Sequence, residues 1–182
     1  VRALTQRPIW AYGWKSVAKR DRFAFWHAHF AGGDENASED CSAELGLHPL
    51  LSPIADLWSH LSQHILAGHV LVRAYANAHT YGVDGTLHTD SKDPDYYSTI
   101  LYAHEVWKFN WAGETAFVSR ETDEVVRSVH PKPGRIVVFK GATPHVARAP
   151  SRECPALRIS VVLKTRRMAT VPQSVDSCGG AA

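Results

Sequence analysis

The sequence has no long apolar run, few cysteines and little net charge, and each lack excludes a class of protein. No window approaches the roughly 18 uninterrupted apolar residues of a membrane-spanning helix, so we expect no membrane span. The cysteines Cys41, Cys154 and Cys178 are odd in number and lack CxxC spacing, which excludes a disulfide scaffold and a cysteine-rich zinc site. Twenty basic and eighteen acidic residues give a formal charge of +2, and the basic residues are too scattered to indicate nucleic-acid binding.

The first residues, Val1 to Thr5, lack the basic patch and apolar core of a secretory signal. Together with the cysteine usage, this favours a reducing cytoplasm as the compartment. We therefore expect a cytoplasmic protein without a membrane or nucleic-acid partner. The sequence carries no signal of oligomeric state.

The composition is that of a globular protein. The 182 residues are 45% hydrophobic and 21% charged, and their number fits one domain spanning residues 1–182. Within it we expect a helical N-terminal part (1–68), a β-core (69–165) and a loose polar tail (166–182). Eleven histidines and six tryptophans draw attention to metal chemistry and to an aromatic core.

The N-terminal part predicts two helices separated by a loop. Apolar residues among charges over 15–30 indicate the first helix, and the acidic, glycine-containing stretch 31–46 indicates a solvated loop. The second helix is predicted from Ser52-Pro53 to about Leu66, because Pro53 suits a first turn and apolar residues follow at helical spacing.

From His69 onward the pattern changes to short β-type runs separated by glycine and proline. The predicted strands are 70–77, 97–102, 114–119, 124–129, 135–139, 145–149 and 157–164. Many short strands after helices predict a mainly β (α+β) fold, a jelly roll with the N-terminal helices packed outside.

The triplet His88-Thr89-Asp90 is the clearest candidate for chemistry. In an extended segment His88 and Asp90 point the same way, which offers two ligands of a facial site of two histidines and one carboxylate. His145 is the best third ligand, because it opens a later strand after the turn that ends at Pro144. The alternative for the pair alone is a surface histidine beside a solvated aspartate.

A second constellation predicts an anion pocket. Arg158 and Ser160 share one face of the last predicted strand, and an arginine pointing into a barrel is costly to bury unless it meets an anion. Tyr102 ends another predicted strand, where its hydroxyl could reach the same cavity. We expect Lys164, at the strand end, to be solvated.

Taken together, these segments resemble the iron(II)- and 2-oxoglutarate-dependent dioxygenases of the prolyl 4-hydroxylase-like branch. The resemblance extends from Val70 to Lys164, and order and spacing make it far more specific than any single motif. The matching residues are Leu87-His88-Thr89-Asp90, Ile100-Leu101-Tyr102, Trp107, Gly113-Glu114-Thr115, the run from Pro131 to Phe139, His145, and Arg158-Ile159-Ser160.

This resemblance implies a double-stranded β-helix in which His88, Asp90 and His145 hold Fe(II). It also implies that Arg158 pairs with the distal carboxylate of 2-oxoglutarate, with Ser160 on the same face, and that Tyr102 hydrogen-bonds the same group. The implied reaction uses O2 to hydroxylate an unactivated C–H bond and releases succinate and CO2. One departure is Pro155, which stands where many prolyl hydroxylases have the lysine that anchors 2-oxoglutarate.

Candidate substrate residues follow from a polar stripe. Arg73, Tyr75 and Asn77 share one face of a predicted strand, which either faces solvent or lines the cleft and touches substrate. The resemblance also implies that Tyr75 lies near the metal. Trp111 flanks a turn near the mouth and is a candidate lid residue. The substrate is a small molecule, a carrier-tethered molecule or a protein side chain.

Two other functions remain open. The first is a non-catalytic, cupin-like domain that binds a metal or ligand in the same barrel. The second is a zinc hydrolase, which needs a general base near the metal-bound water and gives Arg158 no task.

Overall fold

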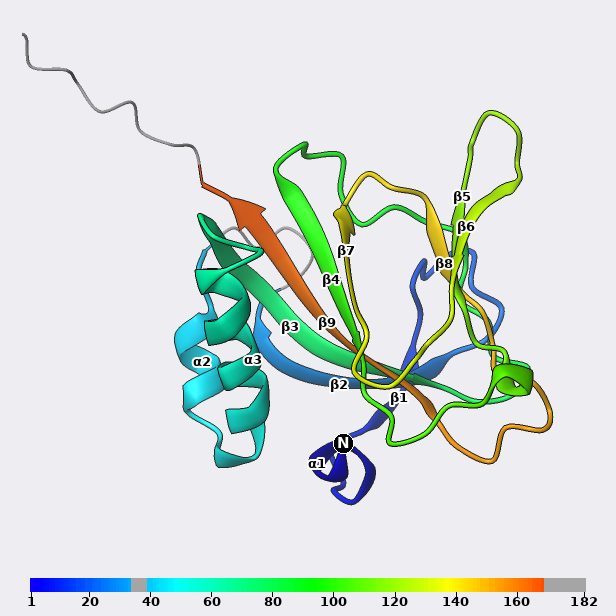
Figure 1. Cartoon of the computed structure of the whole chain (residues 1–182), viewed down its shortest axis with the longest axis horizontal. Helices are drawn as coiled ribbons and strands as arrows, with labels where there is room; N and C mark the ends of the chain where they lie inside the picture. Colours follow the sequence, from blue (N-terminus) through cyan, green and yellow to red (C-terminus); the bar gives the residue numbers. More distant parts are fainter. Residues whose placement is uncertain (34–38, 169–182) are drawn as a thin grey trace, which may run out of the picture.

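The computed structural model describes residues 1–33 and 39–168, and β-strands dominate it (Figure 1). The helical elements are α1 (Arg2–Thr5), α2 (Ser42–Gly46), the 3-10 turn η1 (Pro49–Leu51), α3 (Ser52–Gln63) and the 3-10 turn η2 (Phe109–Trp111). The strands are β1 (Ala11–Trp14), β2 (Phe25–Gly32), β3 (His69–His79), β4 (Tyr96–Tyr102), β5 (Thr115–Val118), β6 (Val125–Val129), β7 (Ile136–Lys140), β8 (His145–Ala147) and β9 (Arg158–Arg167).

The strands form two facing sheets. The larger has the order β1-β2-β3-β9-β4-β7, and the smaller has the order β6-β5-β8. An isolated bridge between His88 and His145 adds the segment between β3 and β4 to the smaller sheet. From β3 to β9 the chain therefore passes repeatedly between the two sheets, which is the double-stranded β-helix, and the predicted jelly-roll class is confirmed.

Two central strands position the site. β3 and β9 pair antiparallel along their whole length, from His69 opposite Arg167 to His79 opposite Arg158. Side chains alternate along a strand, so every second residue of β3 and of β9 lies on the same face of the sheet. This face lines a cavity, and it carries the odd-numbered residues of β3 from Arg73 to His79 and the even-numbered residues of β9 from Arg158 to Lys164.

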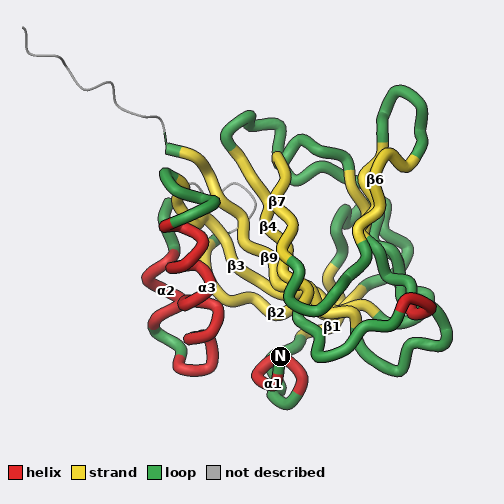
Figure 2. The backbone as a smooth tube through the Cα atoms, in the orientation of Figure 1, coloured by secondary structure: helices red, strands yellow, loops and turns green. Residues whose placement is uncertain are grey.

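The opposite face of the large sheet carries the apolar core. Ala74, Ala76 and Ala78 of β3 belong to the same buried apolar cluster as Trp58 and Leu61 of α3. Helices α2 and α3 accordingly cover the face of the large sheet that points away from the small sheet (Figures 1 and 2). No helix among the described residues is long and apolar enough to span a membrane.

The helix predicted over 15–30 is wrong. Its C-terminal half is β2, which pairs with β1 and β3, because aromatic residues such as Phe25 and Phe30 suit a pleated surface that is buried against neighbours. The predicted loop 31–46 instead contains the end of β2 and helix α2, and residues 34–38 lie outside the described part. The predicted tail begins too early, since β9 continues to Arg167. Residues 169–182 of that tail lie outside the described part of the chain.

Candidate metal and co-substrate site

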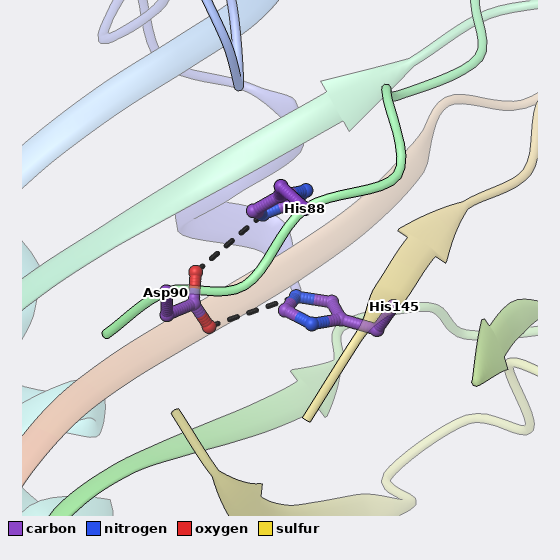
Figure 3. Close-up of side chains that lie close together, drawn as sticks. All are labelled: His88, Asp90 and His145. Carbon is purple, nitrogen blue, oxygen red and sulfur yellow. Dashed lines mark ion pairs between the residues drawn. The ribbon is translucent and has the colours of Figure 1, made fainter. Parts of the chain in front are cut away.

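Three side chains from two segments converge inside the barrel. His88 and His145 exchange backbone hydrogen bonds, His88 N–H to the His145 carbonyl at 3.1 Å and the reverse at 2.9 Å, which fixes the two segments side by side. Asp90 Oδ1 lies 3.5 Å from His88 Nε2, and Asp90 Oδ2 lies 3.6 Å from His145 Nε2 (Figure 3). One ligand atom from each residue falls within 4.8 Å of the other two.

The histidine rings are held with Nε2 free for a metal. His88 Nδ1 lies 2.7 Å from the Thr86 carbonyl, and His145 Nδ1 lies 2.9 Å from the Thr143 carbonyl, so each Nδ1 carries the proton. Burial lowers the pKa of His145 to about 4, so this ring is neutral near pH 7. Each Nε2 faces Asp90.

Asp90 is held as a carboxylate. Ser98 Oγ donates a hydrogen bond to Asp90 Oδ2 at 2.6 Å, and the Lys164 ammonium forms an ion pair with the same oxygen. Burial raises the pKa of Asp90, but Lys164, His88 and His145 outweigh burial and keep this pKa well below its usual range. With Oδ2 occupied by these donors, Oδ1 remains for a metal.

The expectation that Lys164 is solvated is wrong, since its exposure is only 6%. It lies within β9, which is flanked by β3 and β4 in the middle of the large sheet, with Arg73 opposite it on one side and Ser98 on the other. Its ammonium also donates to Ser98 Oγ at 2.9 Å.

These donors fit a divalent metal ion of the iron type. Two atoms bound to one ion at about 2 Å each lie no more than about 4 Å apart, and His88 Nε2 and Asp90 Oδ1 meet this limit at 3.5 Å. Two imidazoles and one carboxylate on a single face match the ligand set of non-haem Fe(II) oxygenases.

A cavity of about 700 Å³ surrounds the triad and joins it to most of the other predicted site residues. The predicted residues that line it are His88, Asp90, His145, Arg158, Ser160, Arg73, Tyr75 and Asn77. The alternative of a solvent-facing stripe on β3 is thereby excluded. Tyr102 and Trp111 do not line the cavity.

Arg158 presents an unused donor to this cavity. Its side chain is 1% exposed, its Nε donates to the Gly113 carbonyl at 2.5 Å, and its Nη2 donates to Thr115 Oγ1 at 2.9 Å. Nη1 is buried without a hydrogen-bond partner among the residues described. Gly113 is required here, because its φ is +83° and a Cβ would come within 3.0 Å of the Trp107 ring. A buried cation with a free donor fits the carboxylate of a ligand.

Tyr102 supports this arginine from below the cavity surface. It is fully buried, its hydroxyl donates to Thr115 Oγ1 at 2.7 Å, and the Arg158 guanidinium lies 5.5 Å from the centre of its ring. Thr115 lines the cavity in its place. The matching segment Gly113-Glu114-Thr115 includes this residue, but nothing in the sequence indicates that Thr115 and not its neighbours contacts Arg158.

His79 is a second residue that sequence reasoning missed. It lines the cavity opposite Arg158 in the β3–β9 ladder and is 2% exposed. Within the described chain, neither of its ring nitrogens has a hydrogen-bond partner. Burial and, to a lesser extent, the charge of Arg158 lower the pKa of His79 to about 3, so the ring is neutral.

Trp111 lies away from the cavity in η2. Its ring packs edge-on against Trp107 with centroids 5.6 Å apart, and the Lys108 ammonium lies 5.6 Å from its centre. The short 3-10 turn directs the indole onto Trp107, so the structure does not bring this candidate lid residue to the triad.

Comparison with known proteins gave matches among solved structures alone. No family model matches the chain, and no curated protein does. An oxidoreductase of the 2OG-Fe(II) oxygenase family from Burkholderia pseudomallei is 16% identical, with a TM-score of 0.66 over 91% of this chain and 76% of that one. A prolyl-4-hydroxylase from Pseudomonas putida is 21% identical, with a TM-score of 0.51 over 80% of this chain and 70% of that one.

A third similar structure is a prolyl hydroxylase from Trichoplax adhaerens, in complex with a peptide fragment of the oxygen degradation domain of hypoxia inducible factor. It is 18% identical, with a TM-score of 0.56 over 90% of this chain and 73% of that one. At these identities the likeness shows the fold. The structural neighbours are 2-oxoglutarate and Fe(II) oxygenases and prolyl hydroxylases, as the sequence resemblance implied.

Proposed function

We propose that the protein is an Fe(II)- and 2-oxoglutarate-dependent dioxygenase. It hydroxylates an unactivated C–H bond of a small molecule, a carrier-tethered molecule or a protein side chain, and it releases succinate and CO2. The observation that carries this proposal is one cavity that holds both the triad His88, Asp90 and His145 and the buried, partly unpaired Arg158.

The triad would hold Fe(II) on one face through His88 Nε2, Asp90 Oδ1 and His145 Nε2. Bound iron supplies the open coordination positions at which 2-oxoglutarate and O2 react. The chain's own contribution is to orient both imidazoles through the Thr86 and Thr143 carbonyls, which leaves each Nε2 for the metal, and to keep Asp90 ionised. Ser98 and Lys164 hold that carboxylate in one orientation.

Arg158 would bind the distal carboxylate of 2-oxoglutarate. Its free Nη1 supplies one donor, and Ser160 lies beside it on the same face of β9. Gly113 and Thr115 fix the guanidinium through its other nitrogens, so little side-chain freedom is lost when the co-substrate binds. Burial lowers the pKa of Arg158, and pairing with an anionic carboxylate would compensate for that burial.

The two alternative functions explain less of the site. A zinc hydrolase needs a general base. Asp90 is the sole carboxylate among the described residues that line the cavity, and it is already engaged by Lys164 and Ser98. His79 also lines the cavity, but its pKa of about 3 makes it a weak base. A cupin-like binding domain does not need both the triad and a separate buried arginine.

An anaerobic binding experiment tests the proposal. The protein is loaded with Fe(II), its metal content is measured, and 2-oxoglutarate is titrated by calorimetry. We expect one iron per chain and one 2-oxoglutarate per iron. The variant His88→Ala should lose both, whereas the control His60→Ala, an exposed histidine on α3, should retain both. Stoichiometric zinc binding with no binding of 2-oxoglutarate to the iron-loaded protein would overturn the proposal in favour of a hydrolase.

A further inference from the structure

Arg73 is a second cation in the cavity, and it forms no ion pair with any described residue. Its guanidinium lies near two aromatic rings, 5.2 Å from the centre of Trp14 and 5.0 Å from that of Tyr75. Its Nε is buried, and residues 1–33 and 39–168 offer this atom no hydrogen-bond partner and the guanidinium no ion pair. Aromatic faces orient a guanidinium but do not satisfy its N–H donors.

The charges that line the cavity do not balance. Four described cations line it (Lys15, Arg73, Arg158 and Lys164), and Asp90 is the one described carboxylate. Asp90 is paired with Lys164, and the proposed function assigns Arg158 to 2-oxoglutarate. Arg73 also lies directly opposite Lys164 in the β3–β9 ladder, where two like charges are unfavourable. An anion at Arg73 would relieve this repulsion and satisfy its donors.

Arg73 and Arg158 lie at opposite ends of the cavity. Arg158 pairs with His79 and Lys164 pairs with Arg73 in the same ladder, so about 20 Å of strand separates the two ends. Lys164 reaches the metal ligand Asp90, which places the triad on the Arg73 side of this span. A group bound at Arg73 therefore does not overlap a co-substrate bound at Arg158.

The side chains next to Arg73 are held in place by contacts with one another. Trp14 stacks on His27 with ring centroids 4.1 Å apart and an interplanar angle of 11°. His27 Nδ1 lies 2.8 Å from Asn77 Oδ1, so the ring that supports Trp14 is itself held by the polar stripe of β3. This bracing holds the aromatic surface against which the guanidinium lies, and the guanidinium fork can pair with both oxygens of a carboxylate.

We propose that Arg73 is the substrate-anchoring residue and that the substrate carries a free carboxylate. This inference rests on the proposed function and deepens it. Arg73 holds the carboxylate in its planar fork near Trp14 and Tyr75, and the carbon chain of the substrate extends from there toward the triad. The carboxylate belongs either to a small organic acid or to the C-terminus of a peptide.

The test measures binding of defined probes to the complete site. The protein is loaded anaerobically with Fe(II) and saturated with 2-oxoglutarate, so that Arg158 is occupied. Straight-chain monocarboxylic acids of three to eight carbons and their primary amides are then titrated by ligand-observed NMR. A parallel arm uses short peptides with free or amidated C-termini. We expect the free acids of at least one arm to bind and the matched amides to fail, and the arm that binds identifies the source of the carboxylate.

Variants connect this selectivity to Arg73. Arg73→Met should weaken binding of the acids by at least about 30-fold, and Arg73→Lys should recover part of the loss, since an ammonium lacks the bidentate fork. Arg127→Met, at an exposed arginine on β6, is the matched control and should bind the acids normally. All three variants should retain one iron and one 2-oxoglutarate per chain.

Two results would overturn the inference while leaving the proposed function intact. One is equal binding of acids and amides, and the other is unchanged acid binding by Arg73→Met, in each case with normal binding of iron and 2-oxoglutarate. Failure of 2-oxoglutarate to bind the unsubstituted protein would instead remove the proposed function.

Discussion

At the scale of single residues, Arg158 carries the sharpest expectation for the co-substrate. Arg158→Ala should raise the apparent KM for 2-oxoglutarate by roughly 30- to several thousand-fold, because truncating one partner of a buried charge pair costs about 2–5 kcal/mol. The iron content should stay unchanged, since Arg158 contacts Gly113 and Thr115 and no triad residue. Steady-state succinate formation at varied 2-oxoglutarate, together with metal analysis, measures both effects.

The conservative variant separates charge from geometry at this position. Arg158→Lys keeps the charge but loses the hydrogen bonds to Gly113 and Thr115, so it should recover part of the affinity. An unchanged KM in Arg158→Ala would contradict the assignment, and the anchor would then lie elsewhere in the cavity.

The individual site residues differ in how far the sequence predicts them. His88 and Asp90 are two apart in an extended segment, so alternation alone puts them on one side. The same alternation puts Arg158 and Ser160 on one face. The role of Lys164 depends on which strands flank β9, and the position of Tyr102 depends on Thr115 lying between its hydroxyl and Arg158. These contacts join residues that are far apart in the sequence, so a local sequence pattern does not predict them.

At the scale of elements, His104 connects three segments of the barrel. Its Nε2 accepts the N–H of Ile159 at the start of β9 at 2.8 Å, and its Nδ1 lies 3.3 Å from the Pro131 carbonyl before β7. The neutral ring satisfies both contacts, because Nε2 accepts and Nδ1 donates. Burial and, to a lesser extent, the charge of Arg158 lower the pKa of His104 to about 4.

This histidine should make stability depend on pH. Its pKa is about 4 in the folded protein and about 6.5 in the unfolded chain, so below pH 6.5 the unfolded chain takes up a proton that the folded protein does not. The free energy of unfolding should therefore fall between pH 7 and pH 5, by about 2 kcal/mol from this residue. Above pH 7 the residue contributes no further dependence.

Urea unfolding of the protein and of His104→Gln at pH 7 and pH 5 measures this contribution. The other buried histidines are common to both proteins, so the difference between the two pH dependences isolates His104. The variant should be less stable at pH 7 and should lose less stability on acidification. Equal losses in the two proteins would contradict the assignment.

The sequence predicts the elements unevenly. Each predicted strand from 70–77 to 157–164 corresponds to one of β3 to β9, because strand runs are short and turn residues separate them clearly. The failure over 15–30 comes from aromatic residues that fit a helix face by spacing but form β2 through pairing with β1 and β3. Tertiary pairing overrides local preference there.

At the scale of the whole molecule, the two sheets and the N-terminal segment enclose one cavity. The large sheet supplies its polar floor through β3 and β9, the small sheet supplies His145, and residues 13–18 cover part of it. This N-terminal wall includes Trp14, which holds Arg73. The sequence predicts the β-core that lines most of the cavity. It does not predict the contribution of residues 13–18, because no pattern within this segment indicates that it reaches the site.

Formation of succinate from 2-oxoglutarate tests the central claim most directly. The protein is incubated in air with Fe(II) and 2-oxoglutarate, with and without EDTA, beside His145→Ala and the control His60→Ala. The proposed function predicts succinate from the unsubstituted protein and from His60→Ala, and none with EDTA or from His145→Ala, since both treatments remove the metal from the triad. Succinate formation at an undiminished rate in EDTA would contradict the assignment of iron to His88, Asp90 and His145.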